Sequence, residues 1–112
     1  MNILRTIIIE DEKPAQDLLV RWLEAVPEIE LVAICSDGFS GVKAITEHKP
    51  DLIFLDIQMP KLTGFEMLEL VDELPKIIFT TAYNEYAVKA FETGAVDYLM
   101  KPFSNSRLID AI

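Results

Sequence analysis

Hydrophobic residues gather along this chain in two alternating patterns. The first is a short apolar or β-branched run bounded by polar or turn-forming residues, which is typical of a buried strand. We predict such strands at Leu4–Ile9, Glu30–Cys35, Leu52–Leu55, Lys76–Thr80 and Ala95–Met100. The third run has no polar residue at all, which indicates burial on both faces, as at the centre of a parallel sheet.

The second pattern is helical spacing between the strands. After Pro14, which suits the first turn of a helix, one apolar face is formed by Ala15, Leu18, Leu19, Trp22, Leu23 and Val26. The other predicted helices follow Gly38, run from Gly64 to a stop at Pro75, and span Asn84–Thr93 and Ser104–Ile112. Gly94 is a plausible cap at the end of the fourth helix.

Five repeats of strand then helix predict an α/β fold with a parallel sheet and helices on both faces. The 112 residues suit one domain. The last helix is only begun where the chain ends, so we expect a domain cut from a longer protein.

Composition narrows the function. The net charge of -9 argues against a nucleic-acid surface, which needs clustered Lys and Arg. Cys35 is the only cysteine, so no internal disulfide can form, and we expect it to be a small buried side chain rather than a redox centre. No apolar run approaches a membrane span and no leader precedes the first strand. We therefore expect a cytoplasmic protein.

Five polar residues stand where predicted strands end: Glu10, Asp11, Asp56, Thr81 and Lys101. Carboxyl ends of parallel strands share one edge of a sheet, where ligands bind. Asp56 alone could equally cap the next turn. Three carboxylates drawn together repel, however, and a cation offsets that repulsion. Oxygen ligands without His or Cys favour Mg²⁺.

Lys101 and Thr81 add an ammonium and a hydroxyl to this edge. A metal ion, an ammonium and a hydroxyl around one carboxylate are what a transferring phosphoryl group needs around its oxygens. Asp56 would then be the nucleophile and form an aspartyl phosphate.

From Leu4 into the last helix, the ordered set of motifs resembles the receiver domain of two-component response regulators, which implies one receiver domain over residues 1–112. The resemblance rests on Glu10-Asp11-Glu12, Asp56 with Met59-Pro60 and Gly64, Thr81-Ala82, and Tyr98-x-x-Lys101-Pro102. It implies a doubly wound, flavodoxin-like receiver fold, with a five-stranded parallel sheet in the order 2-1-3-4-5 and a truncated final helix.

The resemblance also implies residue roles. Asp56 would be the phosphoacceptor, and Mg²⁺ would be bound by Asp11 and Asp56, by Glu10 mostly through water, and by the Gln58 carbonyl. Thr81 and Lys101 would hold phosphoryl oxygens.

The resemblance also implies that Tyr98 is the switch residue, whose ring would turn inward when Thr81 moves toward the phosphate. The Lys101-Pro102 peptide resembles the cis peptide of the family. Tyr83 and Gln58 would border the phosphoryl group and tune its hydrolysis, although Tyr83 and Tyr86 could simply cover the core. The implied partners are a histidine kinase and a second copy, bound through the fourth helix, fifth strand and fifth helix.

A narrower likeness lies in Thr80–Phe91 and Ala95–Pro102, which resemble receivers joined to a LytTR-type DNA-binding domain. Such an output domain is absent from these 112 residues. The domain itself is then expected not to bind DNA, and to be a phosphoacceptor with self-catalysed phosphorylation and dephosphorylation rather than an enzyme.

Three rival functions make different demands on the sequence. A phosphohydrolase of the haloacid-dehalogenase type needs a second Asp two residues beyond the nucleophile, where this chain has Gln58. A flavodoxin-like flavin module needs a phosphate-binding loop after the first strand, where Glu10-Asp11-Glu12 would repel phosphate. A receiver-like docking module that acts without phosphorylation remains the alternative.

The remaining residues have plain structural interpretations. The aromatic side chains Trp22, Phe54, Phe65, Phe79 and Phe91 are predicted to lie in the core. His48 could relay a phosphoryl group, but its place on a polar helix face favours a solvated residue.

Overall fold

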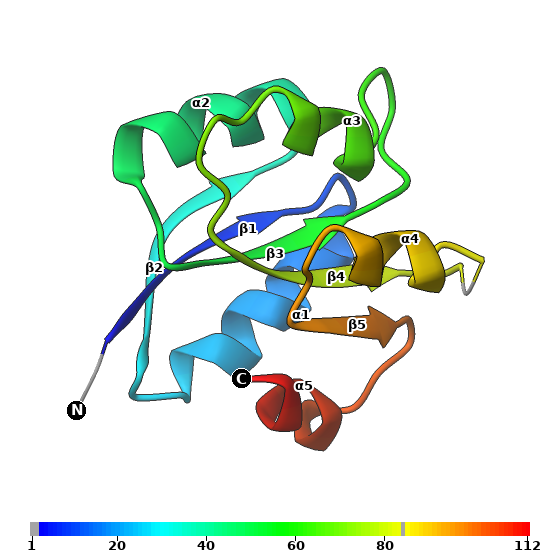
Figure 1. Cartoon of the computed structure of the whole chain (residues 1–112). Coiled ribbons are helices and arrows are strands. Elements are labelled where there is room, and N and C mark those ends of the chain that lie inside the picture. Colours follow the sequence, from blue (N-terminus) through cyan, green and yellow to red (C-terminus); the bar gives the residue numbers. More distant parts are fainter. Residues whose placement is uncertain (1–2, 84) are drawn as a thin grey trace.

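Five parallel strands form one sheet in the computed structural model, which describes residues 3–83 and 85–112 (Figure 1). The strands are β1 (Leu4–Ile9), β2 (Ile29–Cys35), β3 (Leu52–Asp56), β4 (Lys76–Thr81) and β5 (Asp97–Met100). Their order is β2-β1-β3-β4-β5, and every neighbouring pair is parallel. The predicted doubly wound α/β fold and its strand order are thus confirmed.

Helices cover both faces of the sheet. They are α1 (Lys13–Glu24), α2 (Gly38–His48), α3 (Gly64–Glu69), α4 (Ala87–Glu92) and α5 (Asn105–Ala111). Figure 1 shows α2, α3 and α4 on one face and α1 and α5 on the other. Each strand therefore has an apolar layer on both sides, as the unbroken apolar run of β3 predicts.

The side chains of each strand alternate between two separate cores. On β3, Ile53 and Leu55 pack in the core under α2, α3 and α4, whereas Phe54 packs in the core against α1 and α5. Ile9 and Ile8 of β1 divide in the same way. This alternation follows from the two-residue period of a strand. Packing in both cores holds in place the strands whose carboxyl ends carry Glu10, Asp11, Asp56, Thr81 and Lys101, and we call this end of the sheet the polar edge.

Two helices are shorter than predicted. α3 ends at Glu69 instead of continuing toward Pro75, and Leu70 and Leu74 are 54% and 47% exposed. The two leucines are spaced as on a helix, but no element in the described part of the chain covers them. α4 begins at Ala87 rather than Asn84, which lies outside the described residues.

The prediction that all five aromatic side chains lie in the core is wrong for Phe91, which is 54% exposed. Six residues of helix are enough to bury only a narrow stripe, and in α4 that stripe is formed by Ala90. Phe91 follows one position later and turns toward solvent. Phe54 and Phe79 are fully buried, as predicted.

Caps fix the helices next to the polar edge. The Asp37 side chain accepts a hydrogen bond from the Ser40 amide at the start of α2. Thr63 and Glu66 form a reciprocal capping box at the start of α3. Gly94 follows Thr93, the C-cap residue of α4, and has a φ of +84°, which confirms the predicted glycine at this helix end.

Candidate functional site

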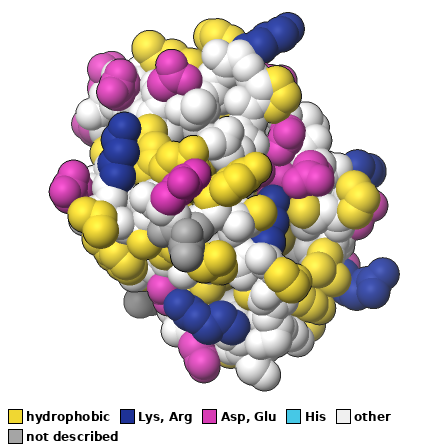
Figure 2. Space-filling view, turned by 90° about the vertical axis from the view of Figure 1, so that its right-hand side faces the viewer, with side chains coloured by type: hydrophobic (Ala, Val, Ile, Leu, Met, Phe, Trp, Pro, Cys, Tyr) yellow, Lys and Arg dark blue, Asp and Glu magenta, His cyan; other side chains and the backbone are white. Residues whose placement is uncertain are grey.

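The polar edge predicted from the strand ends is present. β1 and β3 are neighbours, with Ile9 paired to Leu55, so the residues that follow β1 face the last residue of β3. Glu10 and Asp56 are both buried, at 0% and 3% exposure. Figure 2 views this end of the molecule, where acidic, basic and hydrophobic side chains are interspersed.

Four carboxylates converge here. Glu10, Asp11, Glu12 and Asp56 each offer an oxygen, and these oxygens lie within 4.8 Å of one another. Glu12 was not among the predicted ligands, although its place in the acidic run beside Asp11 was a usable signal. Gln58 is a predicted metal ligand only through its backbone carbonyl. Its side chain donates a hydrogen bond to the Tyr86 hydroxyl.

The donor set fits a hard divalent cation. Asp11 Oδ1 is buried and has no hydrogen-bond partner within the described part of the chain. A buried carboxylate oxygen without a partner is costly, and a bound cation removes that cost. Oxygen-only ligands are those that Mg²⁺ prefers. Asp11, Glu10 and Asp56 could therefore hold Mg²⁺, with Glu12 at the exposed rim.

Lys101 brings the one ammonium among these carboxylates in the described structure. Its Nζ lies 2.6 Å from Glu10 Oε1, 3.4 Å from Asp56 Oδ2 and 3.7 Å from Glu12 Oε1. Burial alone would lower the pKa of Lys101, but the hydrogen bond to Glu10 and the negative charge of Asp56 leave that pKa raised. Lys101 therefore stays cationic inside the site.

Asp56 sits in an unusual electrostatic environment. Burial, followed by the negative charge of Glu10, raises the pKa of the Asp56 carboxyl to about 8, while Lys101 acts in the opposite direction. The Asp56 carboxyl can therefore lose its proton near neutral pH when a cation binds beside it. A nearby divalent cation would favour the ionised, nucleophilic form.

Thr81 is fully buried at the end of β4. Its hydroxyl accepts a hydrogen bond from the Tyr83 amide at 3.3 Å, and its carbonyl accepts one from the Lys101 amide at 2.7 Å. The second contact ties the ends of β4 and β5 together. Thr81 and Lys101 are thus brought to the same edge as Asp56, as predicted.

Gly64 allows the loop after β3 to fold back onto Asp56. A Cβ at this position would lie 2.6 Å from the Asp56 carbonyl oxygen and 3.1 Å from the Ile57 Cα. Gly64 also donates its amide to the Ile57 carbonyl at 2.9 Å. Any side chain at position 64 would therefore collide with the backbone at the end of β3, which is why glycine suits this place.

Tyr98 is buried on β5, with its ring centroid 6.4 Å from that of Phe79. Its hydroxyl donates a hydrogen bond to the Tyr83 carbonyl in the loop between β4 and α4. The ring is already directed inward, so its turning upon phosphorylation stays a prediction. The Lys101-Pro102 peptide is cis, as the resemblance implied.

Gln58 and Tyr86 form a contact that the sequence does not reveal. The Gln58 side-chain amide donates a hydrogen bond to the Tyr86 hydroxyl, which joins the loop after β3 to the residue before α4. Gln58 was predicted to border the site, but no sequence signal pairs it with Tyr86. The pairing depends on the distance between two loops that are far apart along the chain.

His48 and Cys35 have structural roles. His48 ends α2 at the opposite edge of the sheet from Asp56, and its carbonyl accepts a hydrogen bond from the Arg5 guanidinium at 2.5 Å. His48 thus lies at the other end of β3 from Asp56, and its role as a solvated residue stays a prediction. Cys35 is buried, as predicted, and burial raises the pKa of its thiol.

An apolar hollow of about 250 Å³ adjoins Lys101. It lies between α1 and the segment after β5, and its apolar lining consists of Pro14, Ala15, Leu18, Leu19, Trp22, Pro102 and Phe103. Among the described residues, no helix is both long and apolar enough to cross a membrane.

Known proteins share this sequence and this fold. The family model of the response regulator receiver domain matches residues 6–112. An uncharacterized response regulatory protein of Yersinia pestis is 46% identical over 107 residues, which cover 94% of this chain and 45% of that protein. The transcriptional regulatory protein BtsR of Escherichia coli is 43% identical, with the same two coverages. The chain spans less than half the length of these curated relatives.

Among solved structures, the response regulatory domain of protein mrkE from Klebsiella pneumoniae superposes with a TM-score of 0.88 at 38% identity, covering 96% of this chain and 91% of that one. The match of the family model spans nearly the whole chain and agrees with the carboxylates, Lys101 and the strand order described above. The chain therefore belongs to the response regulator receiver domain family of two-component systems.

Proposed function

We propose that this receiver domain accepts a phosphoryl group on Asp56 and uses it to switch an attached output domain. The observation that carries the proposal is the environment of Asp56. It is a buried carboxyl with three further carboxylates within 4.8 Å and the Lys101 ammonium at 3.4 Å. Such a site holds a cation and balances the charge of a phosphoryl group.

The transfer step follows from these positions. A carboxylate oxygen of Asp56 attacks the phosphorus of a phosphohistidine on a partner histidine kinase, the phosphorus–nitrogen bond breaks, and the imidazole nitrogen leaves with the bonding electrons. Lys101 neutralises charge on the phosphoryl oxygens, and the Thr81 hydroxyl donates to one of them. Asp56 is thus a self-catalysed phosphoacceptor rather than an enzyme with a separate substrate.

The metal ion in this proposal is Mg²⁺, with Asp11, Asp56 and the Gln58 carbonyl as ligands and Glu10 mostly acting through water. The buried, unpartnered Asp11 Oδ1 supports this donor set. When bound, Mg²⁺ favours the ionised form of Asp56 and offsets negative charge on the phosphoryl oxygens. Because Glu10 is also 2.6 Å from Lys101, it links the metal ligands to the ammonium.

The switch would run through Thr81 and Tyr98. A phosphoryl group adds nearly two negative charges beside Thr81 and draws its hydroxyl away from the Tyr83 amide. The Tyr83 carbonyl is bound by the Tyr98 hydroxyl, so this movement would reach the loop that leads into α4. Tyr98 would then fix α4 in its new position.

Two surfaces of the domain are suited to bind protein partners. The hollow lined in part by Glu10 and Lys101 offers an apolar surface to a histidine kinase, and Lys101 also contacts Asp56, to which the kinase would deliver its phosphoryl group. A second copy would use the face of α4, β5 and α5, where large hydrophobic side chains are exposed: Val88, Phe91, Val96, Met100 and Ile109. Homodimerisation would cover these side chains.

For the output, we propose transcriptional regulation through a LytTR-type DNA-binding domain in the cytoplasm. BtsR is described as a transcriptional regulatory protein, and it is more than twice the length of the matching segment. The net charge of -9 supports DNA binding outside this domain. The alternative function is a docking module that works without phosphorylation, for which the same exposed hydrophobic face would suffice.

The proposal is tested by incubating the domain with Mg²⁺ and acetyl phosphate and then measuring its intact mass. We expect the gain of one phosphoryl group, which Asp56→Asn abolishes. Asp72→Asn is the matched control because Asp72 is an exposed carboxylate in the turn after α3. A parent domain that binds Mg²⁺ yet gains no mass would leave the docking module as the better account.

A further inference from the structure

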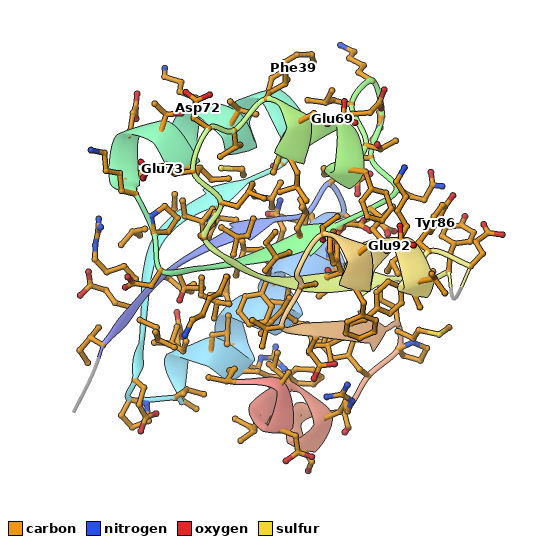
Figure 3. All side chains as sticks on the ribbon, in the orientation of Figure 1. Phe39, Glu69, Asp72, Glu73, Tyr86 and Glu92 are labelled. Carbon is orange, nitrogen blue, oxygen red and sulfur yellow. The ribbon has the colours of Figure 1, made fainter. Side chains whose placement is uncertain are left out.

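Two loops at the phosphorylation site are bridged by side chains. Gln58 lies two residues after Asp56 and is exposed, and Tyr86 is the residue directly before α4. The Gln58 amide nitrogen donates to the Tyr86 hydroxyl. Figure 3 labels Tyr86 at the start of α4, at the end of the sheet where the loop after β3 lies.

The Tyr86 ring is held in place by aromatic neighbours. Its centroid lies 6.0 Å from that of Phe65 in α3 and 6.1 Å from that of Tyr83, both in edge-on arrangements. Phe65 is buried and carries the Lys89 ammonium 4.7 Å from its ring centroid. A ring packed on two sides keeps its hydroxyl in a defined position, so Tyr86 is a fixed anchor for the Gln58 amide.

Within residues 3–83 and 85–112, this hydrogen bond uses the donor end of the Gln58 side-chain amide. Its amide nitrogen is engaged by Tyr86, so its carbonyl oxygen remains as an acceptor on an exposed side chain two residues beyond Asp56. An acceptor there can bind a water molecule and orient it toward a phosphoryl group. Without Tyr86 the same amide is free to rotate and presents donor and acceptor equally.

We propose that Tyr86 is a positioning residue for hydrolysis of the aspartyl phosphate, acting through Gln58. The proposal rests on the function proposed above. The Gln58 carbonyl oxygen accepts a hydrogen bond from water, the water oxygen attacks phosphorus, and the bond from phosphorus to the Asp56 oxygen breaks. Asp56 leaves as a carboxylate, and both water protons depart with inorganic phosphate.

The same contact ties the phosphate lifetime to α4. Tyr86 precedes α4 directly, and the Tyr83 carbonyl beside it is held by Tyr98. A movement of α4 therefore displaces the Tyr86 hydroxyl and releases Gln58. The lifetime of the phosphorylated state is longer after such a movement than before it.

The test is the rate at which the phosphorylated domain loses its phosphoryl group, followed by intact mass after removal of acetyl phosphate. Tyr86→Phe keeps the ring and removes only the hydroxyl. We expect it to lengthen the phosphate lifetime about three- to tenfold, the effect of losing one orienting hydrogen bond. Gln58→Met should lengthen it at least as much, and adding Tyr86→Phe to Gln58→Met should change nothing further.

The double variant separates positioning from packing, because a general disturbance of α4 would also act in the Gln58→Met background. Equal lifetimes for Tyr86→Phe and the parent would overturn this inference alone. The same fold-change in phosphate lifetime from Tyr86→Phe in the parent and in Gln58→Met would overturn it too, because Gln58 would then not transmit the effect. A parent that is never phosphorylated would overturn the proposed function and this inference together.

Discussion

The Lys101 ammonium is closer to Glu10, at 2.6 Å, than to Asp56, at 3.4 Å. Glu10 is fully buried at the end of β1, and Lys101 follows β5, so this pair joins the first and last strands of the chain. The ammonium is therefore both a structural counter-ion and a group available to a ligand on Asp56.

Removing that ammonium should destabilise the metal-free domain. Lys101→Met leaves the buried Glu10 carboxylate without its counter-ion and removes the positive charge beside Asp56, and we expect a loss of about 2–3 kcal/mol in the free energy of unfolding. Urea unfolding in a chelator measures it, and saturating Mg²⁺ should restore part of the loss. Lys43→Met on the exposed side of α2 is the control. Equal losses in both variants would show that Lys101 is not a structural counter-ion.

The stability of the metal-free domain should fall as the pH rises from about 4 to about 8. Burial and Glu10 raise the pKa of Asp56 from its ordinary value of 3.8 to about 8, so in this range the folded state binds a proton that the unfolded state has lost. Stability is then greatest below the unfolded pKa and declines until the folded pKa is passed.

Asp56→Asn should flatten this slope, because the amide does not titrate. At pH 8 in a chelator we expect the variant to exceed the parent by about 2–4 kcal/mol in the free energy of unfolding. Urea unfolding across the pH range is the measurement. Parallel pH profiles for the two proteins would contradict a raised pKa at Asp56.

Gly64→Ala should disturb the site through the backbone of Asp56. The new Cβ would lie 2.6 Å from the Asp56 carbonyl oxygen, so the loop must shift, and we expect a cost of about 1–3 kcal/mol together with slower phosphorylation by acetyl phosphate. Gly94→Ala makes a useful comparison. The new Cβ would meet no atom of the described residues within 4 Å, but the backbone there has a φ of +84°. This variant should therefore lower the free energy of unfolding by about 1 kcal/mol and leave phosphorylation unchanged.

The ion pair between Asp97 and Arg107 should stabilise the folded domain only at pH values at which Asp97 is ionised. Two hydrogen bonds of 2.7 and 2.9 Å join the groups, and the Arg107 side chain lowers the pKa of Asp97. The ion pair therefore contributes its full stabilisation at pH values above the pKa that Asp97 has in the unfolded state. This stabilisation is lost as the pH falls through the lowered pKa that Asp97 has in the folded state.

Since the Arg107 side chain is 43% exposed, Arg107→Met should cost only about 0.5 kcal/mol at pH 7 and nothing near pH 2. Thermal unfolding at both pH values, with Arg21→Met as the control from α1, measures the difference. A cost that persists at pH 2 would assign the effect to packing instead of charge.

Tyr98→Phe should leave phosphorylation intact but weaken its effect on α4. The variant keeps the buried ring and removes the hydrogen bond to the Tyr83 carbonyl. Amide hydrogen exchange at the start of α4 should be faster in the variant, and its change upon phosphorylation should be smaller. Identical phosphorylation-linked changes in the variant and the parent would exclude a switching role for the hydroxyl.

Most of the fold could be predicted because its signals are local. The bounds of β1 match the prediction, and β2 and β3 each extend by one residue, since apolar runs limited by turn residues leave little choice. The strand order came from resemblance, because periodicity does not say which strands are neighbours. α3 was predicted too long, since spacing alone cannot tell whether a neighbouring element will cover Leu74. The exposure of Phe91 could not be predicted for the same reason.

The sequence by itself determined which groups stand at the strand ends: the carboxylates of Glu10, Asp11 and Asp56, the Thr81 hydroxyl and the Lys101 ammonium. Only the tertiary structure decided how these groups share charge, placing Lys101 nearest Glu10 and adding Glu12 to the cluster. It also decided the contacts of Gln58 with Tyr86 and of Tyr98 with Tyr83. Strand ends follow from local chain chemistry, whereas distances between loops depend on how the whole sheet twists and packs.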